Sequence, residues 1–432
     1  MKCPKILIIS HNCFSKNGSN GRTLLNFFEG YPKNKLAQFY IYNEMPFEFV
    51  CENYFRVTDM DALKSAIPFV KHGGSKIYIK SSKTNDKKKN SEKINIPRTP
   101  LVYLIRNLFW NRKKWINIEL KEWIKSFGPD LILFQAGDAS FLYEFVGYVS
   151  SVYNIPYIIY NSENYYFKNY NYLSKKYFGN FFYKLLHKQF KKITYNTISK
   201  AKYSIYISEY LQKLYNTVFD SPSEVIMTSS AIKNSNKINK NGFSYLGNLG
   251  LGRYKSLMKI GMILNEIDNS YYLDIYGSCD ESIKKSLENA KGIRYKGIIS
   301  YTEVLEVMRN SLIVFHVESF DDFYKKDSKY AFSTKIADSI SIGTCLFVYA
   351  PREIEVTKYL DENMVACIVV DEKELKVKLK EIINDKNLRN YYVKNALILS
   401  EKNHNFEKNK IKFFKVIDKV GVKCENKITL NE

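Results

Sequence analysis

Three neighbouring segments near the C-terminal end most constrain the fold of this chain. Residues 312–317 and 345–351 are short apolar runs of the kind that form buried parallel strands, and residues 332–343 between them have the spacing of a helix. A strand followed by a helix and a parallel strand is the repeating unit of α/β proteins. The sequence therefore predicts a doubly wound α/β fold in this part of the chain.

The start of the helical segment is suited to an anion. Ser333 and Thr334 can cap the helix with their hydroxyls, while the helix dipole favours negative charge at the same end. Lys335 adds a positive charge in the first turn, and Asp338 lies one turn further along, within reach of hydroxyls on a phosphate-bearing ligand such as a sugar nucleotide. An ordinary capped helix with a solvated lysine and aspartate explains the same residues, so both interpretations stay open at this point.

The alternation of strands and helices runs through the whole chain and divides it in two. A chain of 432 residues exceeds one typical domain. We expect a Rossmann-like domain over residues 1–232, a linker over 233–242, a second Rossmann-like domain over 243–404, and a helix over 405–432 that crosses back to the first domain. Residues 81–99 are polar, basic and unpatterned, which indicates a mobile loop. Ligands in such sheets bind beyond the carboxyl ends of the strands, so we expect the site in a cleft between facing domains.

A second segment suited to an anion opens the second domain. Residues 247–257 form a glycine-rich loop between a strand and a helix, where backbone amides approach a diphosphate. Arg253 and Lys255 supply positive charge there. Tyr276 and Gly277 end another strand at the same edge, where glycine permits close approach of a ligand. A glycine loop alone is equally a flexible turn, and it is the pairing with the other anion-suited helix start that favours phosphate binding.

Candidate site residues end the strands of the first domain. Asp138 and Glu163 each follow an apolar run, and either carboxylate can act as a general base or as an anchor for a hydroxyl group. His11 follows the first strand and is a further candidate. The alternative is that these side chains are solvated or bond within their own loops.

The net charge of +22 favours an anionic partner. Most of this charge lies in the first 250 residues, and nucleic acid, an anionic membrane surface or an acidic polymer fits it. The seven cysteines form no C-x-x-C pair, which argues against a disulfide framework or a zinc site and favours a reducing compartment. The N-terminal apolar run is too short for a signal peptide, and no uncharged segment reaches transmembrane length. We therefore expect a cytoplasmic protein.

Two tracts of the first domain combine basic and aromatic side chains. They are residues 98–127, with Trp110, Trp115, Trp123, Arg112, Lys113 and Lys114, and residues 165–192, with Phe181, Phe182, Lys184, Lys188, Lys191 and Lys192. Such a mixture suits a membrane interface, where aromatic rings lie at head-group depth and basic side chains meet anionic lipids. It equally suits helices with an aromatic core stripe and a solvated basic face. Stacking on single-stranded nucleic acid is the least favoured interpretation.

These motifs, in this order, resemble those of the GT-B glycosyltransferases, in particular the family 4-like enzymes of bacterial surface polysaccharide synthesis. The resemblance covers nearly the whole chain. It rests on the opening strand with the Gly18 to Gly21 loop, the Arg253 and Lys255 loop, the Tyr276–Gly277 turn, Gly297 at a strand end, and residues 335–343. It implies the GT-B fold, in which two Rossmann-like domains face each other across a cleft.

The resemblance also implies a donor site for a nucleotide-diphosphate sugar in the second domain. Arg253 and Lys255 would neutralise the diphosphate as it leaves. The remaining donor-side residues implied are Gly18, Gly21, Tyr276, Gly277, Ser333, Thr334 and Lys335.

The acidic residues of the family motif match only in part. Asp338, five positions before Gly343, corresponds to the residue that holds the donor ribose, although the family usually has glutamate there. Family members often place an earlier glutamate eight positions upstream. The nearest candidate here is Glu318, twenty positions before Asp338, and this spacing argues against Glu318 as a site residue.

The sequence thus predicts a glycosyltransferase that moves a sugar to a lipid-linked or polysaccharide acceptor, such as a capsule precursor, with retention of configuration. Catalytic candidates are Asp138, Glu163 and Arg253, and we expect no metal or other cofactor because basic side chains can stabilise the leaving diphosphate. The expected location is the cytoplasm or the inner face of the membrane. One alternative is a sugar-nucleotide epimerase or hydrolase of the same fold. Another is a non-catalytic basic protein that binds nucleic acid or a membrane.

Overall fold

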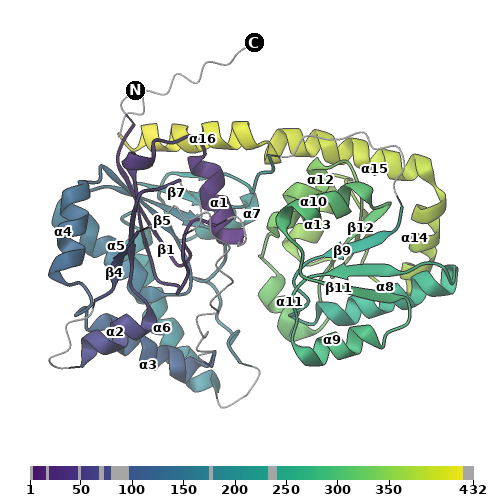
Figure 1. Cartoon of the computed structure of the whole chain (residues 1–432), viewed down its shortest axis with the longest axis horizontal. Helices are drawn as coiled ribbons and strands as arrows, with labels where there is room; N and C mark the ends of the chain where they lie inside the picture. The colour runs from purple at the N-terminus through teal and green to yellow at the C-terminus, as the bar shows by residue number, and fades with distance from the viewer. Residues whose placement is uncertain are drawn as a thin grey trace, which may run out of the picture. The chain divides into compact units, whose positions relative to one another are not determined.

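The chain forms two compact units (Figure 1). The computed structural model describes residues 3–15, 19–46, 50–67, 73–78, 97–174, 179–231 and 241–421. The N-terminal unit comprises Met1–Ile226 and Lys410–Glu432, and the C-terminal unit comprises Met227–Asn409. The loop expected over 81–99 and the linker expected over 233–242 lie mostly outside the described residues.

The N-terminal unit is built on an eight-stranded sheet. Its strands are β1 (Ile6–Ser10), β2 (Leu36–Tyr40), β3 (Asn53–Arg56), β4 (Ser75–Ile77), β5 (Leu131–Gln135), β6 (Tyr157–Asn161), β7 (Tyr203–Tyr206) and β8 (Ser223–Val225). They lie in the order β4-β3-β2-β1-β5-β6-β7-β8, and all neighbours are parallel except β3 and β4. Strands β1, β2, β5 and β6 are buried along their whole length, which accounts for their apolar sequences.

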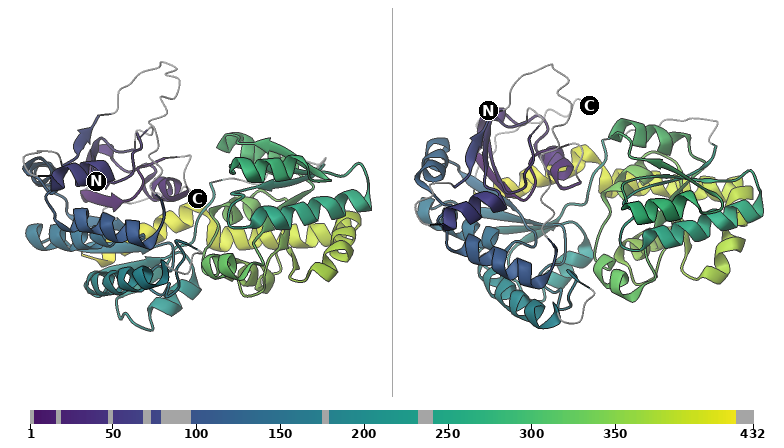
Figure 2. Two further views of the ribbon diagram at one scale, coloured as in Figure 1. Left: turned by 90° about the horizontal axis from the view of Figure 1, so that it is seen from below. Right: turned by 60° about the horizontal axis from the view of Figure 1, so that its bottom comes forward.

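Helices lie on both faces of this sheet (Figures 1 and 2). They are α1 (Ser19–Phe28), the 3-10 turn η1 (Lys33–Lys35), α2 (Asp59–Ala66), α3 (Pro100–Asn111), α4 (Ile118–Phe127), α5 (Ser140–Tyr153), α6 (Gly179–Ile198) and α7 (Glu209–Tyr215). The C-terminal helix α16 (Phe406–Lys419) completes the core. Its Phe413 stacks on Phe27, with ring centroids 4.5 Å apart, and meets Phe28 edge-on at 5.3 Å.

The C-terminal unit is built on a six-stranded parallel sheet. Its strands are β9 (Phe243–Leu246), β10 (Leu273–Tyr276), β11 (Ile293–Gly297), β12 (Ile313–Val317), β13 (Cys345–Tyr349) and β14 (Cys367–Val369), in the order β11-β10-β9-β12-β13-β14. Its helices are α8 (Arg253–Ile267), α9 (Glu281–Glu288), α10 (Tyr301–Asn310), α11 (Asp322–Ser328), α12 (Thr334–Ser341), α13 (Glu355–Glu362), α14 (Glu372–Asn384), α15 (Lys386–Leu399) and the π-helical turn η2 (Ser400–His404). Two Rossmann-like α/β domains are therefore confirmed.

Each sheet reverses its strand order at one point. In the N-terminal unit the chain builds outward from β1 to β4 and then returns to the other side of β1 with β5. In the C-terminal unit it builds outward from β9 to β11 and returns to the other side of β9 with β12. Beyond the carboxyl ends of the two central strands at such a switch point, the following connections leave toward opposite faces of the sheet, and ligands bind there. The β1/β5 and β9/β12 strand ends are thus where functional side chains are expected.

Candidate active site

A buried ion pair joins the two strands at the switch point of the C-terminal unit. Arg253 begins α8 after the loop that follows β9, and Glu318 follows β12 directly. The guanidinium donates from Nε and Nη2 to the two carboxylate oxygens, each at 2.9 Å. Only 15% of the Arg253 side chain and 6% of the Glu318 side chain are exposed. Such a bidentate pair fixes the plane of the guanidinium and leaves its remaining N–H groups directed away from the carboxylate.

Two more polar groups belong to this cluster. The Nε2 atom of His316, on β12, lies 3.8 Å from Oε1 of Glu318. Burial above all lowers the pKa of His316 to about 4, with the charges of Arg253 and Lys335 acting in the same direction and the charge of Glu318 opposing them. The imidazole is therefore neutral at pH 7. Lys335, at the start of α12, is close enough to His316 for its charge to lower that pKa.

Tight backbone packing shapes the rest of this sheet edge. The Gly247 amide donates to the carbonyl of Tyr276 at 2.9 Å, and the Gly277 amide donates to the carbonyl of Gly297 at 2.8 Å. A Cβ atom at Gly277 would lie 1.8 Å from the Gly247 carbonyl oxygen, so this position requires glycine. The Tyr276–Gly277 turn predicted from the sequence is thus packed directly against the glycine loop after β9.

Asp338 lies on the buried face of α12, with 2% of its surface exposed. Its Oδ1 atom accepts a hydrogen bond from the hydroxyl of Tyr301, the first residue of α10, at 3.1 Å. The carboxylate is therefore anchored and not solvated, in contrast to the ordinary capped-helix alternative. Tyr301 was not singled out as a site residue in the sequence, because its partner lies 37 positions away.

The helix start before Asp338 differs from the expectation in one respect. Helix α12 begins at Thr334, so Thr334 lies inside the helix, where its hydroxyl cannot act as the N-cap. Ser333 holds the N-cap position, but its hydroxyl makes no capping hydrogen bond. The predicted hydroxyl caps are therefore wrong. Lys255 lies on the first turn of α8 and is exposed.

A second charged pair marks the switch point of the N-terminal unit. His11 follows β1, and Asp138 lies just beyond β5. The Nε2 atom of His11 is 3.5 Å from Oδ1 of Asp138. The other carboxylate oxygen accepts a hydrogen bond from the Tyr103 hydroxyl at 3.4 Å and lies 3.9 Å from the guanidinium of Arg98.

The surroundings of Asp138 keep its carboxylate ionised. Burial alone would raise its pKa, but the hydrogen bond and charge of His11, with the charges of Arg106 and Arg98, outweigh burial and hold the pKa well below its ordinary value. A carboxylate with so low a proton affinity is a poor general base at neutral pH. Of the two roles considered from the sequence, the anchoring of a hydroxyl group is the better suited to Asp138.

The other N-terminal candidates occupy different settings. Glu163 follows β6, the strand next to β5, and its Oε2 atom lies 3.4 Å from Nζ of Lys168. Gly21 lies on α1, where a Cβ atom would come within 2.7 Å of the Cys13 carbonyl oxygen. Gly18 lies outside the described residues.

Three residues of these candidate sites were not predicted from the sequence: His316 and Tyr301 were missed, and Glu318 was argued against. The long spacing from Asp338 argued against Glu318, His316 lies within an apolar strand, and Tyr301 opens an ordinary amphipathic helix. For Glu318 and His316 a signal does exist, since charged or titratable side chains at the end of a buried parallel strand face the ligand-binding edge.

The described residues lack both a metal-binding group of side chains and a membrane-spanning helix. They contain no group of three or more His, Cys, Asp or Glu side chains placed to hold a metal ion. Within the same residues, no helix combines the length and apolar character needed to span a bilayer.

We predict that the Arg253–Glu318 pair is costly to break on one side only. Glu318→Gln leaves a buried guanidinium without its countercharge, and we expect the free energy of unfolding to fall by about 3 kcal/mol. The double variant Arg253→Met/Glu318→Gln should cost less than the sum of Arg253→Met and Glu318→Gln, because it removes both charges together. Urea denaturation of the four proteins gives the coupling.

The exposed pair between Lys376 and Glu266, at 2.8 Å, provides the matched control. Glu266→Gln should change stability little because water screens that pair. Additive effects at Arg253 and Glu318 would show that the two side chains are not coupled.

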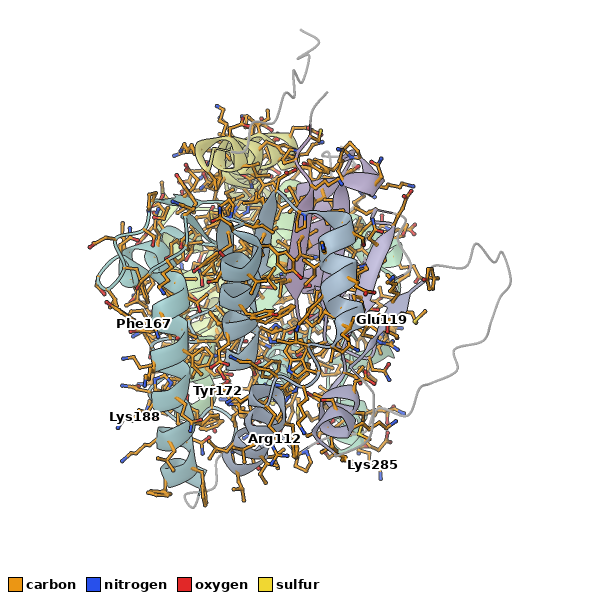
Figure 3. All side chains as sticks on the ribbon, turned by 90° about the vertical axis from the view of Figure 1, so that its left-hand side faces the viewer. Arg112, Glu119, Phe167, Tyr172, Lys188 and Lys285 are labelled. Carbon is orange, nitrogen blue, oxygen red and sulfur yellow. The ribbon has the colours of Figure 1, made fainter. Side chains whose placement is uncertain are left out.

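We predict that Asp138 makes stability depend on pH in the acid range. Its pKa is lower in the folded protein than the ordinary value of about 3.9, so the unfolded chain binds the proton first as the pH falls. Its stabilisation is complete well above pH 4 and declines below that by at most about 1.4 kcal/mol per pH unit. Unfolding at stepped pH should show this decline in the wild type and not in Asp138→Asn. The exposed Glu119 on α4 (Figure 3), changed to glutamine, is the control. Parallel curves for the wild type and Asp138→Asn would contradict the prediction.

The comparisons with known proteins agree on one fold. Residues 261–413 match the family described as "Glycosyl transferase-like". No curated protein is similar in sequence at a significant level. Sucrose-phosphate synthase from Thermosynechococcus elongatus has a similar structure, with a TM-score of 0.62 and 11% identity, over 96% of this chain and 98% of that protein.

Two further solved structures are similar over nearly the whole chain. Anabaena HepE in complex with UDP has a TM-score of 0.63 and 10% identity, over 96% of this chain and 99% of HepE, and another structure of HepE contains UDP-glucose. WaaG, a glycosyltransferase involved in lipopolysaccharide biosynthesis, has a TM-score of 0.59 and 10% identity, over 95% of this chain and 99% of WaaG. These likenesses establish the fold of the two units as GT-B. Residues 261–413 are in addition similar in sequence to the glycosyl transferase-like family.

Proposed function

We propose that this chain transfers a sugar from a nucleotide-diphosphate donor to a lipid-linked or polysaccharide acceptor in cell-surface glycan synthesis. The observation that carries the donor half is the oriented Arg253 guanidinium at the β9/β12 switch point, with Lys335 nearby. The complexes of HepE with UDP and UDP-glucose support a donor of this class.

The charges of this site suit the chemistry of a leaving diphosphate. As the bond between the sugar C1 and the diphosphate oxygen breaks, negative charge grows on the leaving group. The acceptor hydroxyl bonds to C1, and its proton passes to the leaving diphosphate oxygen. Arg253, Lys255 and Lys335 stabilise that charge, with Ser333 and Thr334 at the same helix start. We propose that no metal ion is needed, so activity should persist in EDTA. Retention of the anomeric configuration is part of the proposal, and NMR of the first product formed tests it.

Asp338 is proposed to hold the donor ribose. Its carboxylate is anchored by Tyr301 and can accept hydrogen bonds from ribose hydroxyls. Gly277, Tyr276 and Gly21 are proposed to lie close to the donor through their backbone, as the family resemblance implies.

The acceptor half of the proposal rests on Asp138 and Glu163. Asp138 lies just beyond β5 at the N-terminal switch point and is ionised, and Glu163 follows the neighbouring strand β6. The similarity to WaaG, which acts in lipopolysaccharide biosynthesis, supports a surface-glycan acceptor. A same-fold epimerase or hydrolase would instead consume the donor at the same rate with and without an acceptor.

We also propose that the N-terminal unit binds an anionic membrane surface at the cytoplasmic face. The predicted aromatic contribution needs correction, because Trp110, Trp115 and Trp123 are at most 5% exposed and belong to the core. Five exposed apolar side chains lie instead on two helices that pack together, α3 and α6 (Figure 2). They are Leu101, Ile105, Leu108, Phe181 and Leu185.

Basic side chains border this apolar surface. On α6, Lys184 and Lys188 lie one turn from Phe181 and Leu185 along the same exposed face. Arg112 caps α3, and both Arg112 and Lys188 are visible on the side of the unit shown in Figure 3. Apolar side chains flanked by lysine and arginine are the pattern of a helix that lies on an anionic bilayer.

We predict that the donor site fails when either basic residue is removed. Arg253→Ala and Lys335→Ala should each weaken binding of the nucleotide sugar by about tenfold to a hundredfold, because each removes a charged hydrogen bond to phosphate. Isothermal titration calorimetry with a panel of sugar nucleotides measures this. Lys380→Ala, an exposed lysine on α14, should bind like the wild type. Unchanged affinity in both site variants would refute the donor assignment.

We predict that two lysines of α6 contribute to membrane binding. Lys184→Gln together with Lys188→Gln should lower the partition coefficient onto vesicles with anionic lipid by roughly 30-fold, at about 1 kcal/mol for each basic residue near the surface. Vesicle co-sedimentation measures the change. The pair Lys121→Gln and Lys125→Gln, both exposed on α4, is the matched control. If the two double variants bind alike, α6 is not the docking helix.

A further inference from the structure

Four tyrosines from separate segments surround the Asp138 carboxylate. Tyr42 follows β2, Tyr103 lies on α3, and Tyr165 and Tyr172 lie in the segment after β6. Tyr103 donates a hydrogen bond to Asp138 at 3.4 Å, and Tyr42 meets the ring of His11, whose Nε2 atom lies 3.5 Å from the same carboxylate. Burial raises the pKa of all four tyrosines, and the negative charge of Asp138 acts in the same direction. We call this group, with His11, the tyrosine cluster.

The rings of this cluster are partly accessible. Tyr42 is 43% exposed and meets the His11 ring edge-on, with centroids 5.8 Å apart. Tyr165 and Tyr172 are half-buried, with centroids 6.2 Å apart, and the ammonium of Lys168 lies 5.0 Å from the first ring and 4.7 Å from the second. The cluster thus presents aromatic surface beside an ionised carboxylate.

The charges within and beside the cluster are balanced. Arg106 contacts Asp59 at 2.7 Å and Lys168 contacts Glu163 at 3.4 Å, while Arg98 lies 3.9 Å from Asp138. Each of these basic side chains has an acidic partner, so the cluster offers no surplus positive charge to a phosphate. Phenol hydroxyls, a carboxylate and aromatic faces are instead the groups that match a neutral ring bearing hydroxyls, whose C–H face packs on an aromatic side chain.

Resting on the proposed function, we propose that the tyrosine cluster is the acceptor subsite and that it takes a neutral sugar ring, with a ring hydroxyl held by Asp138. The acceptor is then glycan at the position that receives the new sugar, whatever lipid or phosphate lies further along it. Tyr42 and the Tyr165–Tyr172 pair pack against the ring, and Asp138 accepts from its hydroxyl.

His11 is a positioning residue in this subsite. Its ring packs on Gly137, where a Cβ atom would lie 2.1 Å from the ring carbon Cε1. The absence of a side chain at Gly137 leaves room for the imidazole, whose Nε2 atom lies 3.5 Å from Oδ1 of Asp138. Gly137→Ala therefore displaces His11 without changing any charge. Gly147→Ala is the matched control, since a Cβ atom at Gly147 meets nothing within 4 Å.

The test uses the full-length protein and simple probes. Saturation-transfer NMR measures binding of methyl glycosides of glucose, galactose and N-acetylglucosamine, and of inorganic phosphate. We expect at least one glycoside to bind saturably and phosphate not to compete with it. Tyr42→Ala should weaken glycoside binding by about fivefold to tenfold. Gly137→Ala should weaken glycoside binding as well, whereas Gly147→Ala should bind glycosides like the wild type. The affinity for the nucleotide sugar should be unchanged in all of these variants.

The outcomes separate this inference from the proposed function. If sugar nucleotides bind but no glycoside does, or if phosphate displaces the glycoside, the neutral-sugar subsite is wrong and the donor assignment stands. If Tyr42→Ala binds glycosides like the wild type, the subsite lies elsewhere. If no sugar nucleotide binds, the proposed function fails and this inference falls with it. Equal binding by Gly137→Ala and Gly147→Ala overturns the positioning role of His11.

Discussion

The buried pair of Arg253 and Glu318 is the interaction on which the proposed donor site depends. Strand order brings the two residues together, since β9 and β12 are neighbours although they are far apart in sequence. Glu318 is secured by its own amide, which donates to the Tyr349 carbonyl at 3.2 Å, and its carbonyl accepts from the Ser256 hydroxyl at 3.2 Å. The carboxylate is thus a fixed support, and the guanidinium that it orients has donors left for a ligand.

The same topological rule governs the N-terminal unit with different chemistry. At its switch point the ends of β1 and β5 carry His11 and Asp138, a pair that keeps one carboxylate ionised among tyrosines. One unit therefore presents an oriented cation suited to a diphosphate, and the other presents an anion and aromatic rings suited to hydroxyls. Under the proposed function, the donor and acceptor sites differ because different side chains stand at equivalent positions of two similar sheets.

Much of this arrangement could be predicted from the sequence, for physical reasons. Buried parallel strands must be apolar throughout, so the strands and the α/β class were predictable, as was the glycine loop at Arg253. The spacing from Asp338 argued against Glu318 because sequence distance was taken as distance in space. Residues 321–332 contain helix α11, which begins at its N-cap Asp321 and leaves Glu318 at the end of β12. Helix α11 lengthens the chain between Glu318 and Asp338, while Glu318 stays at the end of β12.

Other features needed three dimensions. The basic and aromatic composition of residues 98–127 indicated either a membrane face or a core, and only burial shows that the tryptophans are core while leucine and isoleucine are exposed. The tyrosine cluster draws residues from four separate segments, so no local sequence pattern indicates it. The cap expected at Ser333 failed because composition indicates which residues can cap a helix, whereas the cap itself depends on where the hydroxyl points.

The central claim is that the oriented Arg253 recognises a diphosphate at the β9/β12 switch point. The most direct measurement is the ratio of the affinities for a nucleoside diphosphate and for its nucleoside, determined by calorimetry in the wild type and in Arg253→Ala. The account predicts that the diphosphate binds at least about tenfold more tightly in the wild type, and that this ratio falls toward one in the variant. An equal ratio in the two proteins would contradict it.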